Sequence, residues 1–296
     1  MKSVAPVLFP ELFSPAAAKP VNVASVPQRS PFRYPGGKTW LIPIFRQWIE
    51  HLPRPSLLVE PFAGGGIISL TTAFEDRADK VLMIEIDKSV AAVWKTILGP
   101  NWEWLSQQIL HFHLTPESAR QLMEKKALSI REAAFQTLVQ NRTAHGGILA
   151  DGAGVLKNGE NGKGILSRWY PQTIARRIRD ISMFSEKIAF IEGDGLETML
   201  KHKKRRDAAY FIDPPYTIGG KRAGNRLYRH CQLDHDSLFA LCGQIEGDFL
   251  MTYDNAPEVR EMADRHGLAS WPITMKSTHH AEMTELLISK DFSWLN

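Results

Sequence analysis

Apolar residues along the chain follow two different spacings, and each spacing predicts a different element. From Thr39 to Leu52 the apolar positions recur with the 3.6-residue period of a helix that buries one face, and prolines just beyond Leu52 end it. Short apolar runs at 57–59 and 81–86 are typical of buried strands, and a helix is expected between them at 67–74. This order predicts one βαβ unit.

The rest of the chain divides between a helical stretch and further strands. The apolar spacing from 99 to 180 is helical, and the segment 146–164 within it is rich in Gly, Asn and Lys. Further strands are expected at 188–191, 208–212, 249–252 and 285–288. We therefore predict the α/β class, with a mostly parallel, Rossmann-like sheet and an inserted helical subdomain.

Three parts of the chain follow from these patterns. Residues 1–30 carry five prolines and no helical or strand period, which is typical of a disordered tail. Residues 31–98 and 180–296 form the predicted sheet domain, and 99–179 the insertion. Because proline interrupts every apolar run in the tail, we expect no secretory signal and a cytoplasmic protein, with an organellar transit peptide left open.

Composition excludes several classes of protein. The 296 residues contain no apolar run of roughly 18 to 20 residues, so a membrane-spanning protein is not expected. Two cysteines, Cys231 and Cys242, exclude a disulfide scaffold and four-thiolate metal sites, and the histidine pairs lack a second pair at metal spacing, so no metal is predicted. A net charge of +4 and a pI near 9.0 leave a polyanionic partner open.

A glycine-rich turn joins the first strand to the following helix. Glycine at 64, 65 and 66 lets the backbone approach a ligand closely, with a helix N-terminus behind it. Glu85 lies 21 positions after Gly64, the spacing at which an acid on the second strand reaches a ribose hydroxyl. Because the third glycine of the dinucleotide fingerprint is missing, the loop favours a ribose ligand without pyrophosphate, of which S-adenosylmethionine is the common one. A plain turn is the alternative.

The segment Asp213-Pro214-Pro215-Tyr216 follows the strand predicted at 208–212, where ligands bind in open α/β sheets. Adenine N6 is a poor nucleophile because its lone pair is delocalised into the ring. The Asp213 carboxylate and the Pro214 carbonyl can accept its two hydrogens and favour the pyramidal amine, while Tyr216 offers a face for the base. The alternatives are a proline-stiffened loop with a capping Asp, or a hydrolytic Asp213.

These motifs together resemble the adenine-specific DNA methyltransferases of the DNA adenine methylase type. Four segments match in the family's order, and they are Phe32 to Lys38, Glu60 to Gly66, Ile84 to Asp87 and Asp213 to Tyr216. Weaker agreement comes from Asn141-Arg142 with Gly146-Gly147, from Gly193-Asp194 and from Thr284-Glu285-Leu286-Leu287. The resemblance covers about residues 31 to 290.

The resemblance implies S-adenosylmethionine as cofactor and assigns its contacts. It implies that Tyr34 and Lys38 contact the cofactor, that the loop with Glu60, Phe62, Gly64 and Gly66 holds its methionine part, that Glu85 binds its ribose, and that Asp194 reaches its adenine. It gives the chemistry to Asp213, Pro214 and Tyr216, the catalytic role to 31–98 and 180–296, and target recognition to 99–179. Glu85 stands where better-known members use Asp, and the insertion matches only in patches, so the recognition sequence does not transfer.

Basic residues favour a DNA partner. Residues 201–230 hold nine Lys+Arg against two Asp, a net +7 that exceeds the whole chain's +4, although 201–206 alone is equally well a solvated surface. The insertion adds further arginines with Trp169 and Tyr170 among them, and it is the candidate for base reading. The residues predicted to contact DNA are Arg33, Asn141, Arg142, Arg168, Lys221, Arg222 and Arg226.

We therefore expect a site-specific methyltransferase that acts on N6 of an adenine flipped out of double-stranded DNA. Two alternatives are methylation of RNA or of a protein amide, and a catalytically silent DNA-binding module of the same fold. A restriction endonuclease with the same target site is an expected companion of such an enzyme.

Overall fold

The computed structural model describes residues 26–33, 36–149, 159, 162–216, 233–276 and 282–295. The α-helices are α1 (Ile42–His51), α2 (Ile67–Phe74), α3 (Lys88–Leu98), α4 (Trp102–His111), α5 (Pro116–Glu124), α6 (Ile130–Thr143), α7 (Pro171–Ser182), α8 (Gly195–His202), α10 (His235–Cys242) and α11 (Pro257–Arg265). The strands are β1 (Leu57–Glu60), β2 (Lys80–Glu85), β3 (Ile188–Glu192), β4 (Ala208–Ile212), β5 (Asp248–Asp254), β6 (Ala269–Lys276) and β7 (Glu282–Ser289). A 3₁₀ turn, η2 (Lys38–Leu41), leads into α1.

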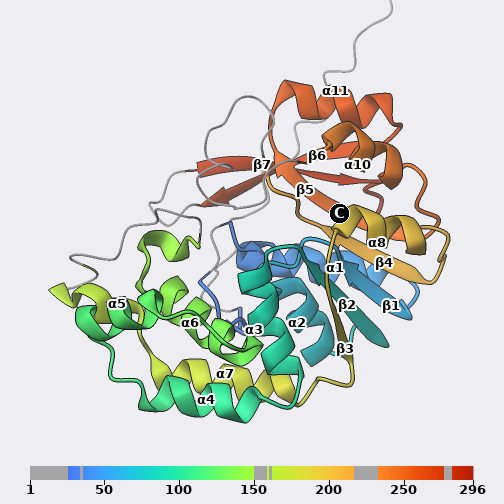
Figure 1. The fold of residues 1–296 in the computed structure, drawn as a ribbon. Helices are drawn as coiled ribbons and strands as arrows, with labels where there is room; N and C mark the ends of the chain where they lie inside the picture. The colour runs from blue at the N-terminus through green and yellow to red at the C-terminus, as the bar shows by residue number, and fades with distance from the viewer. Residues whose placement is uncertain are drawn as a thin grey trace, which may run out of the picture.

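The described strands form one sheet in the order β3-β2-β1-β4-β5-β7-β6. The strands from β3 through β5 are parallel, and β7 runs antiparallel to both of its neighbours. Alternate residues of β1 enter two different cores, because successive side chains point to opposite faces. Leu58 packs with α1, α2 and α3, whereas Leu57 and Val59 pack with α8, α10 and α11 (Figure 1). The predicted α/β class with a mostly parallel sheet is confirmed.

One strand and part of the tail differ from what the sequence patterns indicate. The pattern gave no strand at β6 because Pro272 interrupts it, but β6 is the edge strand, where a missing backbone donor is tolerated. Residues 26–30 fall within the range predicted as a tail. Val26 is nevertheless only 4% exposed, and Ser30 accepts a hydrogen bond from Arg177 Nη1 at 2.9 Å.

The insertion is helical, as its apolar spacing predicts. Helices α4 to α7 gather on one side of the molecule, away from the antiparallel edge of the sheet (Figure 1). They pack on one another and on α3, and Leu105 of α4 and Ile178 of α7 belong to the same buried cluster as Leu58 of the sheet. The insertion is therefore built onto the core of the sheet domain.

Residues 26–33, called the strap below, run between the sheet domain and the insertion. The Asn141 side chain accepts from the Arg33 backbone N–H at 2.8 Å and donates to the Arg33 carbonyl at 2.8 Å. Arg142 Nε donates to the Pro31 carbonyl at 3.1 Å. Buried backbone groups need partners, so these two side chains of α6 fix the strap in place.

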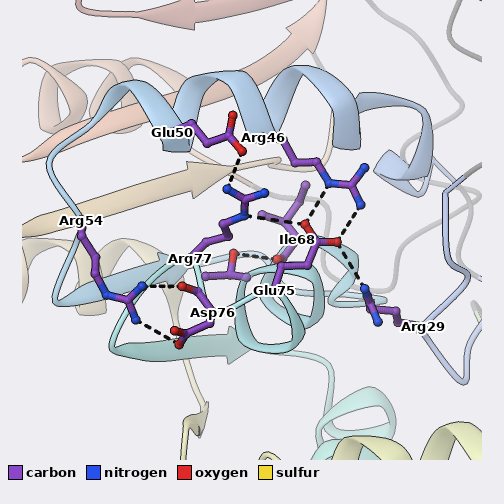
Figure 2. A network of polar contacts seen from close by, with 9 residues as sticks. Arg29, Arg46, Glu50, Arg54, Ile68, Glu75, Asp76 and Arg77 are labelled. Atoms are coloured by element: carbon purple, nitrogen blue, oxygen red, sulfur yellow. Dashed lines mark hydrogen bonds and ion pairs between the residues drawn. The ribbon is translucent and has the colours of Figure 1, made fainter.

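Glu75 also fixes the strap, from the C-terminal end of α2. Its carboxylate accepts from Arg46 Nε at 2.9 Å and from Arg29 Nη2 at 3.2 Å, and Arg77 Nε lies 3.8 Å away (Figure 2). A helix C-terminus disfavours an anion, so the guanidinium groups compensate both the dipole and the partial burial. Burial alone would raise the pKa of Glu75, but the hydrogen bonds and charges of Arg46 and Arg29 outweigh it and lower that pKa.

We expect Glu75→Gln to destabilise the fold by about 1.5 to 3 kcal/mol at pH 7, because it weakens charge-assisted hydrogen bonds to two partly buried arginines. Since the pKa of Glu75 is lowered in the folded state, its contribution is present above the ordinary Glu range and lost as pH falls through the folded pKa. Urea denaturation at pH 7 and at acid pH measures both effects. Glu50→Gln is the control, because Glu50 is 54% exposed. Equal losses for the two variants would contradict the role given to Glu75.

Candidate functional site

A pocket of about 570 Å³ lies at the carboxyl edge of the sheet. Strand order turns between β1 and β4, since β2 and β3 follow β1 on one side and β5 follows β4 on the other. Such a switch point is where open α/β sheets bind ligands. The predicted site residues that line this pocket are Arg33, Lys38, Glu60, Phe62, Gly64, Gly66, Glu85, Arg142, Arg168, Asp194 and Asp213.

The glycine loop and Glu85 are held together by backbone hydrogen bonds. Glu85 Oε2 accepts from the Gly64 N–H at 2.9 Å, and Oε1 accepts from the Asp87 N–H at 2.8 Å. Gly66 has a φ of 63°, and a Cβ there would lie 2.6 Å from Met83 Cε. The loop therefore requires glycine at this position, for its backbone and for its surroundings.

Two buried carboxylates face the pocket from neighbouring strand ends. Burial raises the pKa of Glu60 to about 8, although Ser69 N–H donates to it at 2.9 Å. Burial likewise raises the pKa of Glu85 to about 7, against the hydrogen bonds from Asp87 and Gly64. Both side chains favour a ligand that brings positive charge or hydroxyl donors to them.

Asp213 is the centre of a hydrogen-bonded cluster. Its Oδ1 accepts from Tyr216 OH at 2.8 Å and from Thr252 Oγ1 at 2.7 Å, and it lies 3.0 Å from Lys38 Nζ. Tyr216 stacks on Tyr253, with ring centroids 5.3 Å apart. Burial first, and then the neighbouring carboxylates, raise the pKa of Tyr216, so its hydroxyl stays a donor. Lys38 thus binds the carboxylate of the Asp-Pro-Pro-Tyr segment.

Arginines form another part of the pocket wall. Arg33, Arg142, Arg168 and Arg177 come from the strap and the insertion. Burial first, and then the charges of the other three arginines, lower the pKa of Arg142 to about 10. The pocket therefore has an acidic half from the sheet and a cationic half from the strap and insertion, which suits ligands that carry both charges.

The remaining predicted residues have other places. Pro214 is buried and Tyr216 is partly buried, and neither is among the residues that line the pocket. Asn141 is fully buried with its amide bound to the strap and to the Gly147 carbonyl. The residues that lie outside the described part of the chain are Tyr34, Lys221, Arg222 and Arg226. Within the described ranges, no group of three or more His, Cys, Asp or Glu could hold a metal, and no helix is long and apolar enough to cross a membrane.

Three residues of the site were missed as site residues from the sequence. Thr252 and Arg177 carry no local motif, so only the fold brings Thr252 to Asp213 and Arg177 to the pocket. Glu285 lies in the Thr-Glu-Leu-Leu segment that contributes to the family resemblance, and that segment was the available signal.

A family model matches most of the chain, including the residues of the glycine loop and of the Asp-Pro-Pro-Tyr segment. The model of the D12 class N6 adenine-specific DNA methyltransferases matches residues 34–276. The chain belongs to this family. It is therefore an S-adenosylmethionine-dependent methyltransferase whose substrate is adenine in DNA, and the resemblance drawn from the motifs is confirmed.

Solved structures with a similar fold include two methyltransferases. A putative RNA methyltransferase from Pyrococcus horikoshii is 12% identical, with 87% of this chain and 84% of that chain covered and a TM-score of 0.39. A putative class I S-adenosylmethionine-dependent methyltransferase from Listeria monocytogenes is 7% identical, with 92% and 64% covered and a TM-score of 0.40. Among curated proteins, none matches this chain.

The residues of the pocket fit S-adenosylmethionine. Each oxygen of Glu85 accepts one backbone hydrogen bond, and a carboxylate oxygen has a second lone pair for a ribose hydroxyl. The acidic half suits a sulfonium and an ammonium, and the arginines suit a carboxylate. The volume of about 570 Å³ lies within the usual range for small-molecule sites.

The pKa of Glu85 predicts how cofactor affinity depends on pH. Because that pKa is about 7, the carboxylate loses its proton as pH rises through neutrality, and only the ionised form attracts the cation and accepts from both hydroxyls. We expect the Kd for S-adenosylmethionine to fall between about pH 6 and pH 8.

Glu85→Gln should weaken binding and remove this step, as measured by calorimetry across the same pH range. Glu192→Gln is the matched control, since Glu192 is opposite Glu85 in the β2–β3 register and pairs with Lys95 outside the pocket. A pH step that persists in Glu85→Gln would show that another group controls binding.

Proposed function

We propose that the protein transfers a methyl group from S-adenosylmethionine to N6 of an adenine that is flipped out of double-stranded DNA at a specific sequence. The observation that carries this proposal is that Asp213 shares one pocket with Glu85 and the glycine loop. The Asp213 carboxylate, which suits an amine, therefore faces the same pocket as Glu85 and the glycine loop, which suit the methyl donor.

The chemistry depends on two hydrogen-bond acceptors in the Asp-Pro-Pro-Tyr segment. The Asp213 carboxylate and the Pro214 carbonyl accept the two N6 hydrogens, which favours the pyramidal amine and directs its lone pair into the pocket. When bound, the cofactor supplies a sulfonium methyl, so a carbon–nitrogen bond forms as the carbon–sulfur bond breaks and leaves a neutral thioether. The methylated amine then carries one proton too many, and Asp213 is placed to accept it. Buried carboxylates stabilise the positive charge throughout.

Base flipping is proposed because Asp213 lies inside the protein. Its side chain is 22% exposed, at the wall of a pocket that a base stacked within a duplex cannot enter. Arg33 and Arg168 on the cationic wall would meet the phosphates beside the flipped nucleotide. In this proposal the helical insertion 99–179 recognises the target, and a restriction endonuclease of the same specificity stays a prediction.

Asp213→Ala is expected to reduce methyl transfer by on the order of 10²- to 10³-fold or more, because it removes an acceptor whose interaction strengthens in the transition state. Affinity for S-adenosylmethionine should largely persist, since Glu85 and the glycine loop remain. Single-turnover transfer of a labelled methyl to DNA, with calorimetry for the cofactor, separates the two effects. Asp264→Ala on the exposed side of α11 is the control. Near-normal turnover in Asp213→Ala would overturn the proposed chemistry.

A second prediction tests the cationic wall. If Arg168 neutralises a phosphate, Arg168→Ala should reduce the slope of log affinity against log salt by about 0.9 for duplex DNA. Arg179→Ala is the matched control, because Arg179 lies on the same insertion but is 61% exposed and pairs with Asp180. Salt titrations of a fluorescent duplex measure both slopes. Equal slopes for the two variants would contradict a phosphate contact at Arg168.

A further inference from the structure

Glu285 is a buried carboxylate beside the reacting group, and the proposed chemistry gives it no role. It lies on β7, opposite Asp254 of β5 and Ile273 of β6, and its side chain is 12% exposed. Its Oε2 is 3.7 Å from Lys38 Nζ and accepts from Tyr216 OH at 3.4 Å. Both of these partners also contact Asp213. Burying a carboxylate is costly, so its presence next to a second carboxylate calls for a physical reason.

The two oxygens of Asp213 have different surroundings. Oδ1 accepts hydrogen bonds from Tyr216 OH and Thr252 Oγ1, and Lys38 Nζ forms an ion pair with it at 3.0 Å. A carboxylate oxygen has two lone pairs, so the two hydrogen bonds occupy Oδ1. Among the residues that the structure describes, none donates to the second oxygen, Oδ2, which is therefore the one available to the substrate amine.

The donors that hold Oδ1 are themselves held by Glu285. Lys38 Nζ donates to the Gly36 carbonyl at 3.0 Å and lies between Asp213 and Glu285. Tyr216 OH bridges the same two carboxylates. One ammonium and one hydroxyl are thus shared by two carboxylates from β7 and from the end of β4, which fixes the direction in which each donor points.

We propose that Glu285 is a positioning residue for Asp213: it holds Lys38 and Tyr216 against Oδ1, so that Oδ2 faces the amine. The role rests on the proposed N6 methylation, and it acts through Asp213 without touching the substrate. In this role the ammonium of Lys38 helps to orient the Asp213 carboxylate toward the substrate amine, in addition to any contact with the cofactor.

The charges around Glu285 determine the pH dependence of this cluster. Among the described residues the titratable groups facing it are Lys38, Asp213, Tyr216 and Asp254, with Glu60 next to Asp213. Burial raises the pKa of Glu285, the ammonium of Lys38 opposes this, and the charges of Asp213 and Asp254 add to it. Glu285 therefore takes up a proton at a higher pH than an ordinary Glu does.

Glu285→Gln tests the role, because it keeps the shape of the side chain and removes the charge. We expect kcat for methyl transfer to fall by about 10- to 100-fold, with KM for cofactor and for DNA unchanged, since a misdirected acceptor affects the transition state alone. The acid limb of the pH profile should move to lower pH, because Glu285, whose raised pKa places its protonation at the higher pH, no longer takes up a proton. Glu285→Asp, which keeps the charge, should recover part of kcat and the native acid limb.

Two controls separate this inference from the proposed function and from misfolding. The native protein and Glu192→Gln must both methylate adenine, and their rates test the function itself; an inactive native protein would overturn both the function and the inference. Thermal unfolding of each variant reports the fold. If Glu285→Gln is unstable, the same comparison is made with Glu285→Ala, which also removes the charge. A native kcat and native acid limb in the folded variant without the charge, or a loss confined to KM, would overturn the positioning role.

Discussion

The carboxyl ends of parallel strands bring several acidic side chains to one edge of the sheet, and the rest of the site depends on how their charge is balanced. Glu60 and Glu85 end neighbouring strands, and Asp213 follows the strand on the other side of β1. All three line one pocket. Backbone N–H groups donate hydrogen bonds to Glu85, and the Ser69 N–H in the first turn of α2 donates to Glu60. Lys38 forms an ion pair with Asp213. Each carboxylate is therefore stabilised by a partner that also shapes the pocket.

The cationic half of the pocket has a different origin. It comes from the strap, from α6 and α7, and from the 3₁₀ turn Gly164–Arg168. Side chains of α6 and α7 donate to strap carbonyls and tie these parts together. Arg142 is 5% exposed, so its charge reaches the pocket mainly as a field, whereas Arg33 and Arg168 are partly exposed. The strap at 26–33 precedes the family match at 34–276 and still forms a wall of the site.

Much of the fold and the position of the glycine loop beside Glu85 could be predicted from the sequence, because their signals are local. The strands at 57–60 and 208–212 are continuous apolar runs, and the glycine loop and Glu85 lie at a spacing that the fold requires. Signals that depend on long-range packing were missed. Pro272 interrupts the strand pattern of β6, so that strand was not predicted. No residue next to Thr252 or Glu285 in the sequence indicates that β5 and β7 bring these two side chains to the cluster around Asp213. The role of Asn141 in holding the strap likewise appears only with the tertiary structure.

The central claim is that the pocket holds a methyl donor and a DNA adenine together, and the position of the transferred methyl tests it most directly. The purified protein would be incubated with isotopically labelled S-adenosylmethionine and an equal mixture of unmethylated duplex DNA, RNA and protein. Each component would then be hydrolysed and analysed by mass spectrometry. If the pocket holds a methyl donor and a DNA adenine together, we expect the label in N6-methyldeoxyadenosine from DNA. Label on cytosine, in RNA or on a protein amide, or no label in DNA at all, would contradict it.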